Sequence, residues 1–318
     1  MKKFLITGAL GQIGSELTME LRKRYGNENV VASGLRKEDS IVVESGPFEI
    51  VDIANYDQVA EAVKKHDIDW IINLAAILSA VGEQKPSLAW EVNMNGLFNI
   101  LEVAREHKCA VFTPSSIAAF GPNTPKDDTP QDTIQRPNTM YGVTKVAGEL
   151  LCDYYYEKFG VDTRGVRFPG LISYATLPGG GTTDYAVHIY YDALQKGEFT
   201  CPLDQDTYMD MMYMPDAINA IIDLIEADGS KLKHRNAFNV TAMSFNPEGI
   251  FNSIKKHIPD FTMDYDVNPT LQKIANSWPN SLDDSAAKEE WGWNPQYDLD
   301  AMTKDMLEKL KEKLNIEK

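Results

Sequence analysis

Short apolar runs alternate with helical stretches through the first half of the chain. In residues 58–66, for example, Val59, Ala62 and Val63 fall on one face of a helix. The run 70–74 is largely apolar, as expected of a strand that is covered on both faces of its sheet. The pattern predicts strands at 4–6, 29–33, 48–51, 70–74, 109–113 and 163–167, and helices at 13–25, 58–66, 90–106 and 141–159.

Alternation of strands and helices predicts an α/β fold with a doubly wound parallel sheet, because parallel neighbours need helical crossovers. The pattern changes after Pro169, where a Gly- and Pro-rich stretch begins. Beyond it we expect helices at 184–196, 217–227 and 300–314, and a strand at 237–240 that returns to the sheet. We therefore predict a dinucleotide-binding domain of residues 1–170 plus about 210–243, and a smaller, mainly C-terminal substrate lobe of residues 171–209 and 244–318.

The composition excludes several classes of function. The net charge of −16 provides no basic face for nucleic acid and would be repelled by anionic membrane surfaces. Cys109, Cys152 and Cys201 are far apart, which argues against a disulfide framework or a zinc site. Because no apolar stretch is long enough to cross a membrane, we expect a cytoplasmic protein. Because the sequence has no Cys/His cluster, we expect no bound metal.

A glycine-rich motif lies between the first predicted strand and the first helix. Gly8, Gly11 and Gly14 form G-x-x-G-x-x-G, with Gln12 and Ile13 between the last two glycines. The first glycine permits a tight turn, the second lets a pyrophosphate approach the backbone, and the third lets the helix pack on the sheet. The N-terminus of the helix would offer free N–H groups to the phosphates. The motif predicts a dinucleotide site of the Rossmann type.

The ends of the later strands add candidates for cofactor contact. Asp52 and Ile53 follow the third strand, where a carboxylate could reach the adenine, and small residues end the fourth strand at Leu74, Ala75 and Ala76. NAD sites usually carry an acidic residue at the end of the second strand, bonded to the ribose. Gly34 stands there instead, and Arg36 follows it. We predict NAD, but Arg36 leaves NADP open because a guanidinium could accept a 2′-phosphate.

A second motif predicts catalytic chemistry. Tyr141 and Lys145 are spaced i, i+4 and so share one face of the predicted helix 141–159. Free tyrosine has a pKa of about 10, and a nearby ammonium group stabilises the phenolate. Tyr141 is therefore a candidate general base, and Ser116, after the fifth strand, can hold the reacting oxygen beside it. These three side chains fit the oxidation of a secondary alcohol.

Together the motifs resemble the extended short-chain dehydrogenases, which include UDP-galactose 4-epimerases. The resemblance covers nearly the whole chain and rests on the glycine motif, Asn73–Ala76, Asn93–Gly96, Ser115–Ser116 and the Tyr141/Lys145 pair. Within this group the chain looks most like the short-chain L-threonine 3-dehydrogenases. The segments that carry that likeness are 74–79, 167–173, 179–186, 277–279 and 283–285.

The resemblance implies a reaction and further site residues. The reaction would convert L-threonine to 2-amino-3-oxobutanoate as a nicotinamide cofactor is reduced. Ser79, Thr182 and Thr183 would bind the amino acid substrate, with Trp278 closing the pocket. Additional cofactor contacts would come from Asn93, Pro169 and Leu171. Relatives usually have Asp in place of Gly34, and their long helices form a homodimer interface.

Purely structural roles remain open at several of these positions. Thr182 and Thr183 could simply form a turn that caps a helix, and Trp278 could be an ordinary core residue. The sequence does not identify the partner of a substrate ammonium group. A nucleotide-sugar 4-epimerase or dehydratase is the second hypothesis, but it would need basic residues for a diphosphate, and only Arg235 follows Arg167. A non-catalytic dinucleotide-binding protein is the third.

Overall fold

A six-stranded, fully parallel sheet forms the centre of the computed structural model, which describes residues 2–179 and 181–316. Its strand order is β3-β2-β1-β4-β5-β7, so the chain runs outward from β1 in one direction and then returns to continue in the other. This reversal between β1 and β4 creates the switch point at which doubly wound folds bind ligands. The strands are β1 (Phe4–Thr7), β2 (Val30–Gly34), β3 (Phe48–Ile50), β4 (Trp70–Asn73), β5 (Ala110–Phe112) and β7 (Thr163–Arg164).

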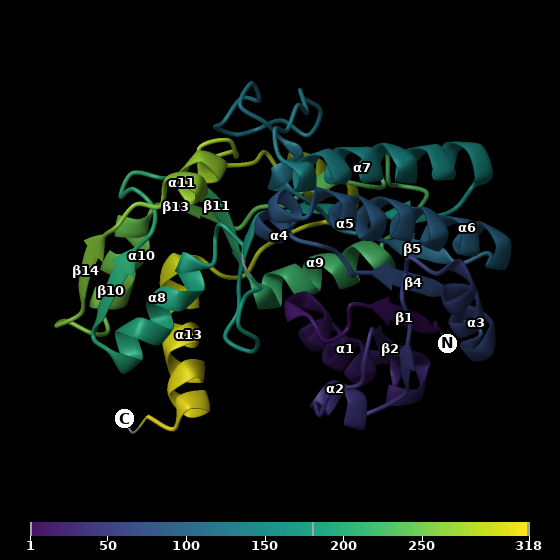
Figure 1. Ribbon diagram of the computed structural model, residues 1–318, viewed down its shortest axis with the longest axis horizontal. Helices are drawn as coiled ribbons and strands as arrows, with labels where there is room; N and C mark the ends of the chain where they lie inside the picture. The colour runs from purple at the N-terminus through teal and green to yellow at the C-terminus, as the bar shows by residue number, and fades with distance from the viewer. Residues whose placement is uncertain (1, 180, 317–318) are drawn as a thin grey trace.

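Helices cover both faces of this sheet, which confirms the predicted fold class. The helices of the first half are α1 (Gln12–Tyr25), α2 (Ile41–Glu44), α3 (Tyr56–His66), α4 (Ser79–Gln84), α5 (Pro86–Trp90), α6 (Leu97–His107) and α7 (Met140–Phe159). Packing of α6 on α3, α7, β4 and β5 covers one face, and α1 with the later helix α9 (Met214–Glu226) covers the other. Figure 1 shows α7 running beside α5 and α6, with α1 and α9 across the sheet.

The predicted helix 90–106 is helical throughout, but it is not regular, because a π-helical segment, Glu91–Gly96, joins α5 to α6. Within it, Asn93 accepts a hydrogen bond from the Ile77 N–H (2.8 Å) and donates one to the Ile77 carbonyl (3.0 Å). The amide of Asn93 also donates to the Thr144 hydroxyl on α7 (3.1 Å). The irregular turn therefore joins the chain after β4 to the helix that carries Tyr141.

The predicted strand 163–167 is not a single strand. Gly165 divides it into β7 and β8 (Val166–Phe168), because a Cβ at Gly165 would lie 2.3 Å from the Thr113 carbonyl oxygen. Strand β8 belongs to a separate three-stranded sheet, between β6 (Ser115–Ser116) and β12 (Phe238–Asn239). The predicted returning strand 237–240 is the observed β12, and it joins this small sheet rather than the central one.

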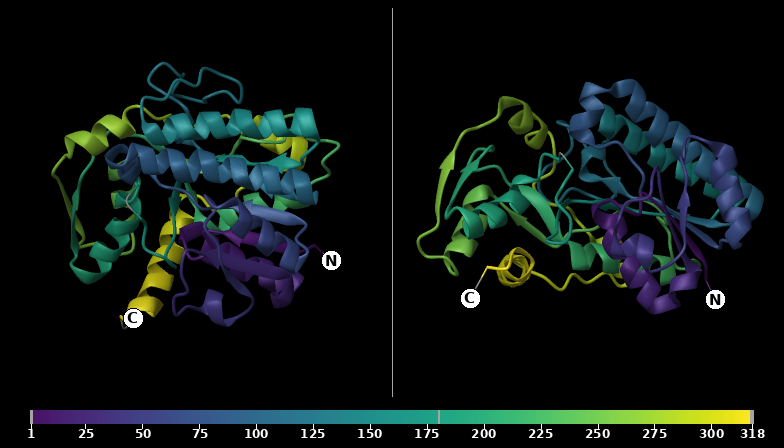
Figure 2. Two further views of the ribbon diagram at one scale, coloured as in Figure 1. Left: turned by 45° about the vertical axis from the view of Figure 1, so that its right-hand side comes forward. Right: turned by 60° about the horizontal axis from the view of Figure 1, so that its bottom comes forward.

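The C-terminal half builds a second hydrophobic core around α8 (Tyr185–Gln195), α10 (Pro247–Lys255) and α13 (Leu299–Leu314). Its strands form two small sheets, β13-β11-β9 and β10-β14. The remaining elements are β9 (Gly170–Ile172), β10 (Glu198–Cys201), β11 (Met209–Tyr213), β13 (Met243–Phe245), β14 (Thr262–Tyr265), α11 (Pro269–Ala275), α12 (Ser285–Trp291) and 3-10 turns at Asn27–Asn29 and Ile117–Ala119. Figure 2 shows these C-terminal elements beside the central sheet. The residue boundaries of the two predicted domains stay a prediction.

The structure also bears on membrane-spanning helices, the cysteines and metal-binding clusters. Within residues 2–179 and 181–316, no helix combines the length and apolar character needed to cross a membrane. The three cysteines are buried free thiols, and the same residues contain no cluster of His, Cys, Asp and Glu that could hold a metal ion.

Candidate active site

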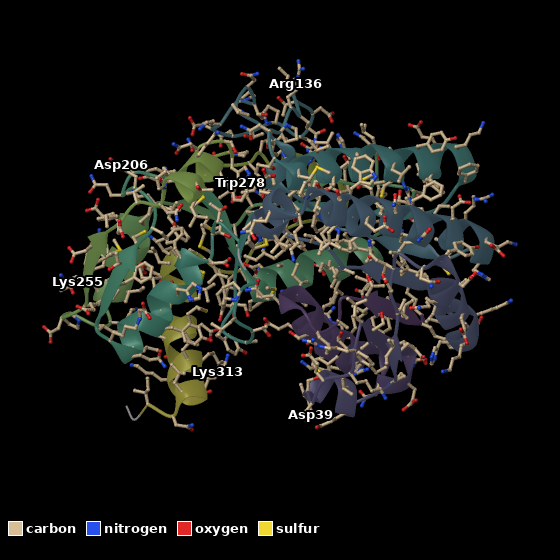
Figure 3. The ribbon with its side chains drawn as sticks, in the orientation of Figure 1. Asp39, Arg136, Asp206, Lys255, Trp278 and Lys313 are labelled. Atoms are coloured by element: carbon tan, nitrogen blue, oxygen red, sulfur yellow. The ribbon has the colours of Figure 1, made fainter. Side chains whose placement is uncertain are left out.

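A cavity of about 280 Å³ opens at the carboxyl ends of β1 and β4, where the strand order reverses. The glycine loop, the start of α7 and the chain that follows β8 form its walls. Sixteen predicted site residues line it: Gly8, Gly11, Gln12, Ile13, Gly14, Leu74, Ala76, Ser79, Ser116, Tyr141, Lys145, Pro169, Leu171, Thr182, Thr183 and Trp278. Figure 3 shows Trp278 where the C-terminal half meets the central sheet.

The glycine loop packs against the chain after β4 without space for side chains. Gly8 has a φ of +66°, and a Cβ there would lie 2.8 Å from the backbone nitrogen of Ala75. At Gly14 a Cβ would lie 2.3 Å from the Gly8 carbonyl oxygen. Helix α1 begins directly after Gly11, and no side chain among the described residues caps its first turn. Its N–H groups therefore face the cavity free to bind an anion.

Tyr141 and Lys145 lie one turn apart at the start of α7. The Thr139 hydroxyl caps this helix by accepting a hydrogen bond from the Gly142 N–H (3.1 Å). The Lys145 ammonium lies 5.3 Å from the centre of the Tyr141 ring and donates to the Pro114 carbonyl (2.7 Å). Two residues further on, the Ser116 hydroxyl oxygen accepts from the Ala118 N–H (3.2 Å). Because that bond uses only the oxygen, the hydroxyl proton of Ser116 remains available to a ligand.

Polar groups on the opposite wall come from the segment before α8. The Thr182 hydroxyl is buried and has no hydrogen-bond partner among the described residues. No described side chain caps α8, so the alternative of a helix-capping role for Thr182 is not supported. Asp184 also lines the cavity, and its carboxylate accepts from the Gly181 N–H (2.7 Å). Gly180, which belongs to the predicted motif 179–186, lies outside the described residues.

The wall that continues from β9 is held from two sides. The Ser173 hydroxyl donates to the Glu16 carboxylate on α1 (2.5 Å), and burial raises the pKa of Glu16 above its ordinary value. From the other side, the Lys313 ammonium on α13 donates to the carbonyls of Tyr174 (2.9 Å) and Ala175 (3.0 Å). Lys313 is marked in Figure 3. The chain that continues from the cavity-lining strand β9 is therefore attached to both α1 and α13.

Five predicted cofactor residues do not line the main cavity: Arg36, Asp52, Ile53, Ala75 and Asn93. The Arg36 side chain is 80% exposed and pairs with Glu38 (2.7 Å). The Asp52 carboxylate accepts from the Ala54 N–H (3.0 Å), as in a surface turn. Ala75 and Asn93 line a smaller cavity of about 40 Å³ behind Lys145. Their contact with a cofactor stays a prediction.

Sequence reasoning missed nine lining residues, of which Asp184 is chemically the most informative. It lies inside the glycine-rich segment 179–186 that was singled out, yet nothing local marks it as facing a cavity. The others are neighbours of predicted residues: Leu78, Pro114, Ser115, Ile117, Phe168, Gly170, Gly179 and Gly181.

Comparison with known proteins decides the family. The model of the NAD dependent epimerase/dehydratase family matches residues 4–241. The chain is 58% identical over 314 residues to an uncharacterized epimerase/dehydratase of Staphylococcus saprophyticus, with 98% of each chain covered. This protein belongs to the NAD dependent epimerase/dehydratase family. It is an extended short-chain dehydrogenase/reductase.

Solved structures with high sequence identity to this chain are described as L-threonine dehydrogenases. The chain is similar to L-threonine dehydrogenase from Clostridium difficile, with 66% identity, a TM-score of 0.97 and 98% of each chain covered. It is also similar to a monomeric L-threonine 3-dehydrogenase from a metagenome, with 43% identity, a TM-score of 0.93, and 98% of this chain and 99% of that one covered. The protein is thus a nicotinamide-dependent oxidoreductase that acts on a small molecule.

The observed site fits a nicotinamide dinucleotide. The glycine loop leaves backbone N–H groups uncovered, as a pyrophosphate requires. Next to it, the buried Nε2 of Gln12 has no hydrogen-bond partner among the described residues, so it is available to a ligand. A dinucleotide that reaches from this loop to Tyr141 stays within one continuous cavity.

We expect Gly14→Ala to weaken cofactor binding at least about 10-fold, because the new Cβ would force the loop backbone to move. Titration calorimetry with NAD measures the change. Gly249→Ala on α10 is the matched control, since Gly249 does not line the cavity and its Cβ would meet only side-chain atoms, the nearest at 3.1 Å. Unchanged affinity in Gly14→Ala would contradict the assignment of this loop to the cofactor.

Proposed function

We propose that this protein oxidises L-threonine at its hydroxyl-bearing carbon to 2-amino-3-oxobutanoate, with NAD as the oxidant. The observation that carries the proposal is the cavity in which Ser116, Tyr141 and Lys145 lie with the Asp184 carboxylate and the Thr182 hydroxyl, which has no hydrogen-bond partner in the described part of the chain. The substrate has to share this cavity with the nicotinamide end of the cofactor, because the same lining runs from the glycine loop to Tyr141. Similarity to a structure described as L-threonine dehydrogenase supports the same choice.

Three side chains would perform the proton chemistry. Tyr141, as the phenolate, takes the proton of the substrate hydroxyl, and Ser116 donates a hydrogen bond that holds the reacting oxygen in place. Lys145 stabilises the phenolate by its charge, and its bond to the Pro114 carbonyl fixes the ammonium near the Tyr141 ring. When bound, the nicotinamide would accept the hydride from the carbon that bears the substrate hydroxyl.

The opposite wall would bind the amino acid head group. Asp184 is the only acidic residue among the described residues of the lining, so it is the proposed partner of the substrate ammonium. The hydroxyls of Ser79, Thr182 and Thr183 would bind the carboxylate as neutral donors. Trp278, which is 6% exposed, would close the pocket over the substrate.

The nucleotide-sugar alternative is not favoured by any specific contact. Lys145 is the only lysine or arginine among the described lining residues, and it lies at the catalytic end. A sugar diphosphate would therefore lack the cationic partners that its phosphates need. A non-catalytic role is disfavoured as well, because Tyr141 and Lys145 are both present, with the Lys145 ammonium 5.3 Å from the centre of the Tyr141 ring.

The proposed reaction is tested by following reduced nicotinamide absorbance with L-threonine, without added metal. We expect turnover with L-threonine and much less with L-allo-threonine, L-serine or UDP-galactose. Tyr141→Phe should lower kcat by about 100-fold to 10,000-fold while NAD still binds, since only the base is lost. Tyr208→Phe, at an exposed tyrosine that does not line the cavity, serves as the control. Normal rates in Tyr141→Phe would exclude Tyr141 as the base.

The proposed preference for NAD can be tested at Gly34, which ends β2. A Cβ there meets Phe48 at 3.6 Å and Leu10 at 3.7 Å, so a side chain fits. Gly34→Asp should raise the ratio of kcat/KM for NAD over NADP by about 10-fold, because a carboxylate binds ribose hydroxyls and repels a 2′-phosphate. Gly34→Asn, equal in size but uncharged, should change it less. An unchanged ratio would show that Gly34 does not lie at the ribose.

We further propose that two copies associate through α6 and α7. Large apolar side chains remain exposed there, among them Phe98 (48%), Leu150 (62%) and Tyr154 (51%). The two helices lie side by side along one side of the molecule (Figure 2). Sedimentation should show a dimer that Leu150→Glu dissociates, since burying an unpaired carboxylate is costly. A monomer at all concentrations, as in the metagenomic relative, would contradict this proposal.

A further inference from the structure

A buried ion pair lies one helical turn beyond Lys145. Glu149 on α7 is 5% exposed, and its carboxylate accepts hydrogen bonds from Nε (3.0 Å) and Nη2 (2.9 Å) of Arg167. The Ser115 hydroxyl and the Gln135 side-chain amide (2.6 Å) donate to the same carboxylate. With four donors around it, the charge of Glu149 is fully compensated. The chemistry proposed above does not use this group.

One arm of this cluster holds the segment 114–116, which supports the catalytic residues. Strand β6 contains two residues, Ser115 and Ser116, and within residues 2–179 and 181–316 its one strand partner is β8. Immediately before it, the Pro114 carbonyl receives the Lys145 ammonium. Two backbone-paired residues are a weak support for a segment that must hold both Lys145 and Ser116. The bond from the Ser115 hydroxyl to Glu149 ties this segment to α7 itself.

The other arm reaches the wall that bears Trp278. Nη1 of Arg167 donates to the Asn239 side-chain oxygen (3.1 Å) and to the Gln131 carbonyl (2.7 Å). The amide of Asn239 in turn donates to the carbonyls of Thr129 (3.0 Å) and Asp283 (3.2 Å). The chain at 281–283 is bonded to 129 in both directions. A continuous chain of hydrogen bonds therefore connects α7 with the segment that follows Trp278.

We propose that Glu149 is a positioning residue of the reaction: paired with Arg167, it fixes the segment 114–116 so that the Pro114 carbonyl and Ser116 stay aligned with Lys145 and Tyr141. The inference rests on the proposed roles of Tyr141 and Lys145. Glu149 acts through Ser115 and touches neither reactant. Displacement of catalytic groups by about 1 Å can cost about 100-fold in rate, so a tie of this kind has a measurable effect.

The test is Glu149→Gln in the full-length protein, compared with Asp162→Asn. Glutamine offers one oxygen to four donors, and its NH₂ would face the guanidinium of Arg167. We expect kcat with L-threonine to fall about 10-fold to 100-fold with little change in NAD affinity, and amide exchange of residues 113–118 in the cofactor-free protein to accelerate. Asp162 is the matched control, because it pairs with Arg164 (2.8 Å) and Arg235 (2.6 Å) but does not hold the segment 114–116.

Asp162→Asn should change neither kcat nor exchange in 113–118. If Glu149→Gln does not fold, Ser115→Ala replaces it, since it cuts only the tie to segment 114–116 and leaves the ion pair intact. Normal kcat with normal exchange in the folded variant overturns the inference, and so does a change in only one of the two. If the unmodified protein fails to oxidise L-threonine, the proposed substrate is wrong, and the exchange measurement still decides whether Glu149 holds this segment.

Discussion

The backbone contact between the glycine loop and the chain after β4 sets the geometry of the whole site. Gly8 and Ala75 approach so closely that no side chain fits between them. A hydrogen bond from the Thr7 hydroxyl to Asn73 (2.7 Å) links the same two strand ends. Because β1 and β4 flank the point at which the strand order reverses, this contact lies beside the cavity, and Leu74, Ala76 and Ser79 follow along its wall.

The parts of the structure that depend on local spacing were predictable from the sequence. All six central strands and the helix that carries Tyr141 were located, because apolar periodicity and i, i+4 spacing are properties of neighbouring residues. The glycine motif is equally local. Predicted cofactor residues that do not line this cavity show the limit of such reasoning. Arg36 and Asp52 follow the correct strands, but nearby partners, Glu38 and the Ala54 N–H, hold their side chains.

Features that depend on contacts distant in sequence were not predictable. The strand 163–167 is divided because Gly165 meets the Thr113 carbonyl, about which the apolar pattern contains no information. Glu149 and Arg167 are 18 residues apart and meet only once α7 has crossed the sheet and β8 has returned. A charged residue in an otherwise apolar strand, such as Arg167, is nevertheless a signal, since a buried guanidinium needs hydrogen-bond acceptors and a carboxylate can be one of them.

The overall charge of −16 and the binding of an anionic cofactor are compatible because they act at different ranges. Net charge is screened over about 8–10 Å of salt solution, whereas the N–H groups at the start of α1 act in direct contact. Among the described lining residues, Lys145 is the only basic and Asp184 the only acidic side chain, at the catalytic end and on the opposite wall. A zwitterionic amino acid can use a carboxylate and neutral hydroxyl donors together. A second nucleotide diphosphate would bring negative charges that this wall cannot neutralise, so the electrostatics favour the small substrate.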